Sequence, residues 1–136
     1  MATEKTEGAE ATLAAIELMR DMSRPVSERF TDDFTDHDPA EGQPSDGSGI
    51  AWFWERFGES FSDLERDVLE TIVTPTKFIT IMDLSGTHTG AFQGHDATGK
   101  RFTVRNVQVV GFRDGKASDR WGSTDTLGIL QQLGLA

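Results

Sequence analysis

The order of hydrophobic and polar positions divides the chain into a helical first part and a strand-rich second part. Residues 9–22 carry apolar side chains at helical spacing among alanines and charged residues, which predicts an amphipathic helix. Proline disfavours the helical conformation in the residue before it, so this helix is expected to end at Arg24-Pro25. A second, short helix is predicted from about Val26 to Phe34.

A third helix has the strongest amphipathic pattern in the chain. It follows a stretch rich in Gly, Pro, Ser and Asp that ends at residue 49 and is expected to form a loop. Its apolar side chains recur at helical spacing, at Ile50, Phe53, Trp54, Phe57 and Phe61. An aromatic stripe of this kind is expected to cover an apolar surface of the same protein.

Beyond Asp63 the composition shifts to Val, Ile, Thr and Phe, which is typical of β-strands. A last helical turn is expected from Leu127 to Leu133, with Asp125 as its cap. Helices that precede strands indicate an α+β fold, in which the helices pack on one face of an antiparallel sheet. Turn residues separate the four predicted strands, at about 65–73, 77–90, 101–113 and 116–124.

The length of 136 residues fits a single domain over residues 1–136, in which residues 1–8 are expected to form a flexible N-terminus. The chain contains no cysteine, which excludes disulfides and thiolate chemistry and suits a reducing compartment. It has no run of about 18 apolar residues, and its first residues are acidic where a signal peptide would be basic and then apolar. We therefore expect a cytoplasmic protein that does not bind membranes.

The charge balance narrows the range of partners. The chain has 13 Lys and Arg against 23 Asp and Glu, a net charge of −10. Nucleic acids and anionic membranes bind clustered positive charge, so we expect neither as a partner. The acidity itself is explained most simply by solubility.

Neither a metal site nor an organic cofactor is indicated. His95 and Asp96 have the residue types of metal ligands, but adjacent side chains on a turn rarely converge and no third ligand is evident. Gly47-Ser48-Gly49 lacks the strand-turn-helix context that exposes a nucleophilic serine. We therefore expect no metal and no cofactor.

A series of short motifs extends along nearly the whole chain. In order, they are Asp36-His37-Asp38-Pro39, Gly47, Trp52-Phe53, Phe61, Asp63-Leu64, Gly86-Thr87-His88-Thr89-Gly90, Ala97-Thr98-Gly99-Lys100, Asp114-Gly115-Lys116, Trp121, Asp125 and Gln132-Leu133-Gly134. With these motifs the chain resembles the SnoaL-like polyketide cyclases of the nuclear-transport-factor-2-like superfamily. The resemblance implies a cystatin-like cone, in which a strongly curved antiparallel sheet and three N-terminal helices enclose one deep apolar pocket.

The resemblance also implies a chemistry. In these cyclases an aspartate abstracts the α-proton of an aromatic polyketide ester, and ring closure is an intramolecular aldol reaction without metal or organic cofactor. We aligned the chain on the turn at Asp114-Gly115-Lys116. This places Gly122 at the position of that aspartate and Gln108 at the position of a family histidine.

Three explanations of Gly122 are open. The alignment can slip by one or two residues, so that Asp119 or Asp125 supplies the carboxylate, although strand alternation places Asp119 on the face opposite to residue 122. Another residue can have taken over the proton transfer. Alternatively, the pocket binds a ligand and does not catalyse aldol closure.

Polar residues spaced to line such a pocket are the candidates for its chemistry. Asn106, Gln108, Arg120 and position 122 share parity within their strands, which predicts that they project into the pocket. Arg120 is a candidate catalytic residue because a guanidinium can hold a carboxylate or polarise a carbonyl. The candidate catalytic proton carriers are His37, Asp38 and His88, and the candidate ligand-binding residues are Trp54, Asn106, Gln108 and Gly122.

Several candidates also have a structural interpretation. His88 lies among glycines that suit a bend in a strand. Asp38-Pro39 is a common turn pair, and Arg120 can form an ion pair with its neighbour Asp119 or contact a partner subunit. Both interpretations remain open for these residues.

The sequence therefore predicts a small-molecule pocket protein, a cofactor-independent polyketide cyclase or isomerase acting on a hydrophobic carbonyl compound. An epoxide-hydrolase-like or hydroxylase-like variant of the family is an alternative. A second alternative is a non-catalytic accessory protein of the same fold that binds an apolar ligand or dimerises. The resemblance implies a homodimer, with a tetramer as an alternative, and a small hydrophobic molecule as the ligand.

Overall fold

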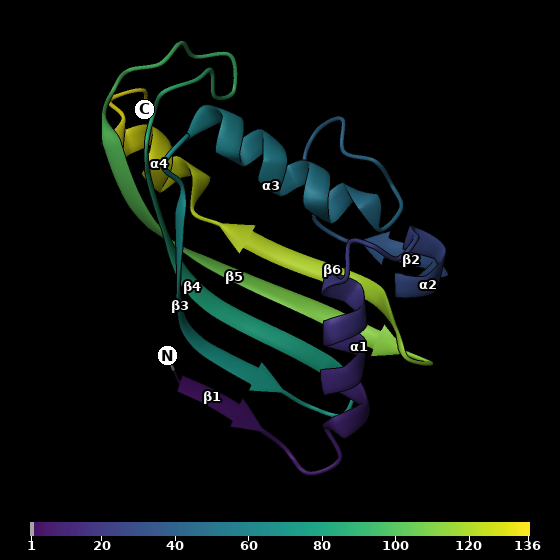
Figure 1. Cartoon of the computed structure of the whole chain (residues 1–136). Helices are drawn as coiled ribbons and strands as arrows, with labels where there is room; N and C mark the ends of the chain where they lie inside the picture. Colours follow the sequence, from purple (N-terminus) through teal and green to yellow (C-terminus); the bar gives the residue numbers. More distant parts are fainter. Residues whose placement is uncertain (1) are drawn as a thin grey trace.

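The computed structural model describes residues 2–136, which form one strongly curved, six-stranded sheet with helices packed on it (Figure 1). The strands pair in the order β1-β3-β4-β5-β6-β2. Strands β3 to β6 are antiparallel, whereas β1 and β2 pair in parallel with β3 and β6 at the two edges. The strands are β1 (Ala2–Lys5), β2 (Phe30–Asp36), β3 (Glu65–Val73), β4 (Lys77–Thr87), β5 (Arg101–Arg113) and β6 (Lys116–Thr124).

The helices α1 and α3 cross the same side of the sheet, and α4 lies near the C-terminus at one end of it (Figure 1). The Asp125 carboxylate caps α4, as predicted, by accepting a hydrogen bond from the Gly128 N–H at 2.8 Å. None of the helices within residues 2–136 is long and apolar enough to cross a membrane. The helices are α1 (Glu10–Arg20), α2 (Val26–Arg29), α3 (Ser48–Ser60) and α4 (Thr126–Gln132).

The predicted second helix is wrong beyond its first turn. Only residues 26–29 are helical, and the chain then continues as strand β2. Phe30 and Phe34 are buried in the core, and β2 pairs in parallel with β6. Backbone pairing with a strand far away in the sequence therefore overrides the weak helical preference of this segment.

Three further boundaries differ from the sequence analysis. Helix α1 ends at Arg20 and not at Arg24-Pro25, because Asp21 already has an extended backbone. No element was predicted before residue 9, yet β1 pairs with β3 at the edge of the sheet. Strand β4 ends at Thr87 and not at residue 90, because the next residues leave the sheet and the Gly90 N–H bonds the Ser60 carbonyl at the end of α3. The bounds of β3, β5 and β6 agree with the prediction.

The inward-facing positions of β5 show how the core is divided. Phe102 and Val104 belong to an apolar cluster that includes residues of α3 and α4. Val110 and Phe112 belong to a second cluster, packed with α1 and β2. Between the two clusters the inward positions 106 and 108 are polar, and the 106 side chain is fully buried. A polar segment of the sheet thus lies between two apolar clusters.

Candidate functional site

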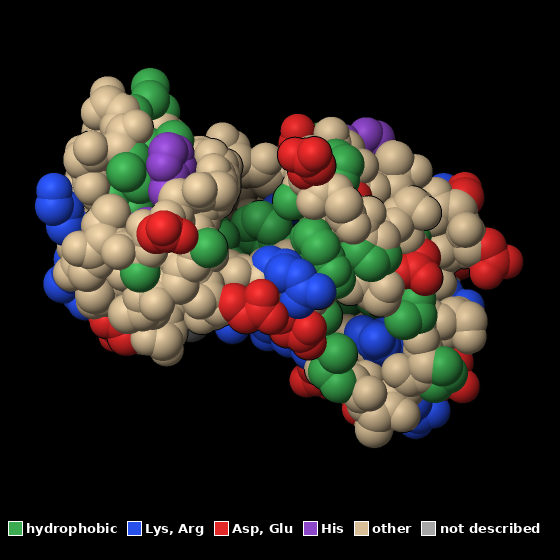
Figure 2. Space-filling model, turned by 90° about the horizontal axis from the view of Figure 1, so that it is seen from above, with side chains coloured by type: hydrophobic (Ala, Val, Ile, Leu, Met, Phe, Trp, Pro, Cys, Tyr) green, Lys and Arg blue, Asp and Glu red, His purple; other side chains and the backbone are tan. Residues whose placement is uncertain are grey.

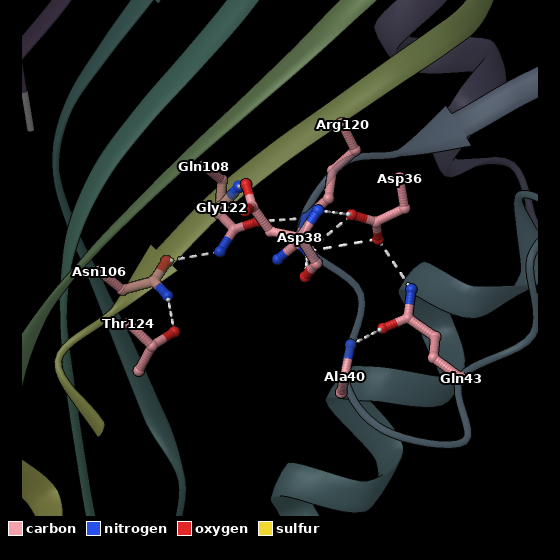
Figure 3. A network of polar contacts seen from close by, with 9 residues as sticks. All are labelled: Asp36, Asp38, Ala40, Gln43, Asn106, Gln108, Arg120, Gly122 and Thr124. Carbon is pink, nitrogen blue, oxygen red and sulfur yellow. Dashed lines mark hydrogen bonds and ion pairs between the residues drawn. The ribbon is translucent and has the colours of Figure 1, made fainter. Parts of the chain in front are cut away.

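A chain of hydrogen bonds joins the inward polar side chains of β5 and β6 (Figure 3). Asn106 Nδ2 donates to Thr124 Oγ1 at 2.6 Å, and Asn106 Oδ1 accepts from Gln108 Nε2 at 3.0 Å. Gln108 Oε1 in turn accepts from Arg120 Nε at 2.9 Å. The three side chains therefore lie on the same side of the sheet, since Gln108 lies directly opposite Gly122 across the two strands. Strand parity predicted that all three project into a pocket. Gln108 and Arg120 line the hollows described below, whereas Asn106 is fully buried and lines neither.

A buried ion pair ends this chain of hydrogen bonds. The side chains of Arg120 and Asp36 are only 7% and 3% exposed. Arg120 Nη1 donates to Asp36 Oδ1 at 3.1 Å, to Asp36 Oδ2 at 3.2 Å and to the Asp38 carbonyl at 3.0 Å. The parallel pairing of β2 with β6 places Asp36 directly opposite Arg120. The register of two strands thus decides which carboxylate meets the guanidinium.

The Asp36 carboxylate also accepts hydrogen bonds from the loop that follows β2. Gln43 Nε2 donates to Asp36 Oδ2 at 2.7 Å, and the Asp38 N–H donates to Asp36 Oδ1 at 3.0 Å. A buried ion pair is stable only when such additional bonds offset the loss of hydration. These bonds fix the Asp36 carboxylate, which in turn holds the Arg120 guanidinium in one orientation.

Gly122 is the position at which this arrangement requires a residue without a side chain. A Cβ atom there would lie 2.7 Å from Arg120 Cζ and 2.9 Å from Gln108 Oε1. Among the Arg120 atoms, Nη2 lies nearest to this position, and none of the hydrogen bonds within residues 2–136 uses it. The guanidinium therefore occupies the space of a residue 122 side chain and keeps one nitrogen available.

A carboxylate nevertheless reaches the backbone of residue 122. Asp38 Oδ2 accepts a hydrogen bond from the Gly122 N–H at 3.0 Å (Figure 3). Asp38 belongs to the loop after β2, so this carboxylate is supplied by a different segment of the chain from the one that the resemblance implies. Asp38 is exposed at the surface, unlike Asp36.

Two hollows border this network, and Arg120 lies in the wall of both. The first, which we call the Asp38 hollow, has a volume of about 880 Å³ and also includes Gly122. Seen from above, the molecule is hollowed between two lobes, with hydrophobic side chains gathered in the hollow and charged side chains beside it (Figure 2). The aromatic residues that line the Asp38 hollow are Trp52, Phe53, Phe57 and Phe92.

The second hollow, which we call the arginine-lined hollow, has a volume of about 820 Å³. It lies between α1, α2, the first half of α3 and strands β3 to β5. The resemblance implies one deep pocket, and among the described residues this hollow and the Asp38 hollow share Arg120. Most of the second hollow is apolar, with walls that include Met19, Val26, Phe30, Ile50, Trp54, Phe78, Met82 and Val110.

The two candidate histidines lie away from the polar network. His37 projects on the outer face of the sheet, where its ring stacks on Trp121 with the centroids 4.6 Å apart. Its Nε2 lies 2.9 Å from Asp119 Oδ1. This hydrogen bond from His37 holds the pKa of the Asp119 carboxyl below its usual value. Because Asp119 contacts the His37 ring, which stacks on Trp121 of the outer face, Asp119 lies on the face opposite to Gly122, as strand alternation predicted.

His88 is fully buried and lines neither hollow. Its Nδ1 accepts a hydrogen bond from the Thr98 N–H at 3.1 Å, and its ring packs near Phe61 and Phe92. Because Nδ1 acts as an acceptor, a neutral ring carries its proton on Nε2, which has no hydrogen-bond partner in the described part of the chain. These contacts tie the loop after β4 to the core.

Trp54 was predicted as a ligand-binding residue, whereas Asp36 was not predicted to belong to the site. Trp54 lines the arginine-lined hollow and not the Asp38 hollow. Asp36 was not among the candidates, although it is the ion-pair partner of Arg120. The sequence places Asp36 and Asp38 two residues apart in one motif. That Asp36 faces Arg120 could be predicted only if residues 30–36 had been recognised as a strand.

Within residues 2–136, no group of three His, Cys, Asp or Glu side chains is placed to hold a metal ion.

Comparison with known proteins identifies the family. The family model for the SnoaL-like polyketide cyclases matches residues 9–133, so the chain belongs to this family. A search of curated proteins finds no match. The mixed α+β architecture with a curved sheet is accordingly that of the nuclear-transport-factor-2-like proteins.

Solved structures of similar chains support the same fold. IdmH from Streptomyces antibioticus is 25% identical, with a TM-score of 0.66 over 95% of this chain and 99% of that chain. TsrD from Streptomyces laurentii is 21% identical, with a TM-score of 0.72 over 93% and 96%. A SnoaL-like polyketide cyclase from Agrobacterium tumefaciens is 17% identical, with a TM-score of 0.62 over 95% and 100%.

Proposed function

We propose that this protein is a cofactor-independent cyclase or isomerase that deprotonates a hydrophobic carbonyl compound in the Asp38 hollow. The observation that carries the proposal is the Asp38 carboxylate, 3.0 Å from the Gly122 N–H and in the same hollow as Arg120. Family membership supports the reaction class. The position of Asp38 supports its role as the base, in place of the aspartate that Gly122 replaces.

The proposed reaction begins with the transfer of an α-proton from the substrate to the Asp38 carboxylate. The electrons of the broken C–H bond move onto the carbonyl oxygen, and Arg120 Nη2 donates a hydrogen bond to the resulting enolate. In ring closure, the enolate carbon bonds a second carbonyl carbon of the same molecule, and the resulting alkoxide takes the proton from Asp38. In isomerisation, the proton returns to a different carbon. Neither reaction needs an oxidant or a reductant.

The remaining walls of the Asp38 hollow suit a flat or conjugated substrate. Trp52, Phe53 and Phe57 belong to α3, and Phe92 to the loop after β4. Aromatic side chains of this kind bind apolar rings through large contact areas. Arg120 lies over the Phe53 ring, with its Cζ atom 5.6 Å from the ring centroid. A ring stacked beside Phe53 would bring its carbonyl group close to the guanidinium.

A ligand-binding protein without turnover is the second candidate. The observation that favours it is the pair Gly122 and Gln108, which replaces the aspartate and the histidine that the resemblance implies. On this alternative, Asp38 and Arg120 hold a ligand by hydrogen bonds and no proton is exchanged. The same experiment separates the two candidates.

The experiment measures proton exchange at carbon and needs no knowledge of the natural substrate. A bicyclic ketone, 2-tetralone, is incubated in D2O, and the loss of its α-proton signals is followed by NMR. We expect the wild-type protein to accelerate the exchange and Asp38→Asn to lose about 100-fold or more of that acceleration. Asp119→Asn is the matched control, since this carboxylate lies on the outer face and should have no effect. Binding of the ketone without accelerated exchange would favour the second candidate.

We also propose that the protein forms a homodimer through the outer face of its sheet. Outward-facing apolar side chains are adjacent there in the strand register: Ile79 lies opposite Val109, Ile81 opposite Val107, and Val109 opposite Trp121. All of them remain partly exposed in the single chain. An apolar patch of this kind is typical of a protein interface. A solution mass of one chain at micromolar concentration would contradict this proposal, and a mass of four chains would replace it by the tetramer.

A further inference from the structure

The charge in the arginine-lined hollow is opposite to that of the whole chain. The chain has a net charge of −10, yet none of the residues that line this hollow is Asp or Glu. Arg120 is paired with Asp36, but none of the described carboxylates forms an ion pair with the other three arginines of the wall. An apolar wall with such positive charge fits a ligand that has an apolar body and an anionic end. The positively charged residues of the wall are Arg20, Arg29, Arg66 and Arg120.

Arg29 is the most informative of these residues, because it is buried and only 7% exposed. Its Nε donates to the Arg24 carbonyl at 3.0 Å and its Nη1 to the Met19 carbonyl at 2.8 Å. No hydrogen bond within residues 2–136 uses its Nη2, and none of the described carboxylates forms an ion pair with it. A desolvated charge without a counter-charge is costly, so an anion entering the hollow would offset this cost.

The Asp21 carboxylate interacts with the positive charge of Arg29, but it does not offset that charge inside the hollow. The pKa of Asp21 is lowered mainly by hydrogen bonds from Ser23, and Arg29 contributes least to the shift. The Asp21 carboxylate also forms an ion pair with Arg24 and does not line the hollow. Arg29 therefore keeps its positive charge directed at the apolar space.

Arg20 and Arg66 add positive charge at the exposed edge of the hollow. Arg20 Cζ lies 5.2 Å from the centroid of the Phe78 ring, and Arg66 Cζ lies 4.7 Å from that of a Trp54 ring. Within residues 2–136, no hydrogen bond or ion pair engages either guanidinium. Stacking on aromatic rings contributes about 0.5–1 kcal/mol at exposed sites and leaves the N–H groups available to a ligand.

We propose that the arginine-lined hollow binds a small amphiphilic carboxylate, with Arg29 as its main anchor. The carboxylate would accept hydrogen bonds from Arg29 Nη2, and the apolar body would lie against Phe30, Phe78 and Val110. The volume of about 820 Å³ admits an aliphatic chain or a fused aromatic ring system. This inference does not depend on the proposed function, because it concerns the other hollow and involves no turnover.

The test compares an acid with the alcohol of the same carbon skeleton, in the wild-type protein at neutral pH. Calorimetry measures binding of decanoic acid against 1-decanol and of 2-naphthoic acid against 2-naphthalenemethanol, which separates aliphatic from aromatic ligands. We expect at least one acid to bind about tenfold or more tightly than its alcohol, because its hydrogen bonds are charge-assisted. Weak binding of both acids, or equal binding of acid and alcohol in both pairs, would overturn the proposal.

Variants locate the site. Arg29→Gln removes the charge but retains an amide that can bond the main-chain carbonyls, and we expect it to lose the preference for the acid. If this variant does not fold, the exposed pair Arg20→Gln and Arg66→Gln is expected to weaken acid binding severalfold without a loss of stability. Asp38→Asn changes a side chain of the other hollow only, so it should retain acid binding whether or not the protein exchanges protons. An equal loss of acid binding in Asp38→Asn and Arg29→Gln would place the acid in the wrong hollow and overturn the proposal.

Discussion

The two hollows share one arginine and differ in every other charged residue. The Asp38 hollow contains three carboxylates, Asp38, Glu41 and Glu59, and Arg56 in addition to Arg120. The arginine-lined hollow contains four arginines and no carboxylate. The first combination suits proton transfer, which needs a base beside a hydrogen-bond donor, and the second suits a stable anion.

A single helix supplies side chains to both hollows. On α3, Phe53 and Phe57 face the Asp38 hollow, while Ile50 and Trp54 face the arginine-lined hollow. Phe53 and Phe57 are four residues apart, as are Ile50 and Trp54, so each pair lies along its own row of the helix surface. The difference shows that a broad aromatic stripe can serve two binding sites.

The largest expected effect follows from removing the residue that the two hollows share. Arg120→Met leaves the Asp36 carboxylate buried without a counter-charge, which is expected to lower the free energy of unfolding by about 3–5 kcal/mol. Urea denaturation measures this change. The control is the double variant Arg120→Met with Asp36→Asn, in which no buried charge remains, and it should recover part of the loss. An equal loss in the single and double variants would show that the ion pair is not the cause.

A smaller loss of stability is expected when Gly122 is replaced, and the two hollows should respond differently to this change. Gly122→Ala places a methyl group against the guanidinium and is expected to cost about 1–3 kcal/mol, because overpacking forces Arg120 to move. Proton exchange should fall, while acid binding at Arg29 should persist. The matched control is Gly58→Ala in α3, where a Cβ atom meets nothing within 4 Å. Helix propensity predicts that this control gains up to about 1 kcal/mol.

The smallest loss of stability is expected from a change on the outer face, which should alter neither proton exchange nor acid binding. The hydrogen bond from His37 lowers the pKa of Asp119, so this carboxylate stabilises the fold above its unfolded-state pKa. That contribution is lost as the pH falls through the lower, folded-state pKa. His37→Ala should raise the Asp119 pKa in an NMR titration and cost less than about 1 kcal/mol, since the pair is partly exposed. Unchanged titration of Asp119 would contradict the role of this hydrogen bond, and a change in proton exchange would restore His37 as a catalytic candidate.

Most of the fold could be predicted from local pattern. The bounds of β3, β5 and β6 follow from β-branched and aromatic runs between turn residues, and α3 follows from its apolar spacing. Strand β2 could not be predicted in this way, because its pattern is mixed and its stability depends on pairing with β6. Edge strands with few apolar residues depend in general on a partner that the local sequence does not reveal.

Only part of the candidate site could be predicted, because local pattern does not reveal which distant strands pair. Alternation along β5 and β6 identified Asn106, Gln108 and Arg120, which do converge. Asp36 was missed because its importance depends on the register of β2. The histidines were candidates for their chemistry and for their expected place near the pocket, but His37 lies on the outer face and His88 is buried in the core.

The sequence by itself determined the fold class, the family and the inward set of polar side chains on two adjacent strands. Each of these follows from patterns a few residues long or from their order along the chain. Only the tertiary structure decided that Asp36 pairs with Arg120, 84 residues away, and that Asp38 reaches Gly122. It also divided the interior into two hollows of different charge. The physical reason is that strand parity is a local property with a period of two, whereas contact between distant strands depends on their register.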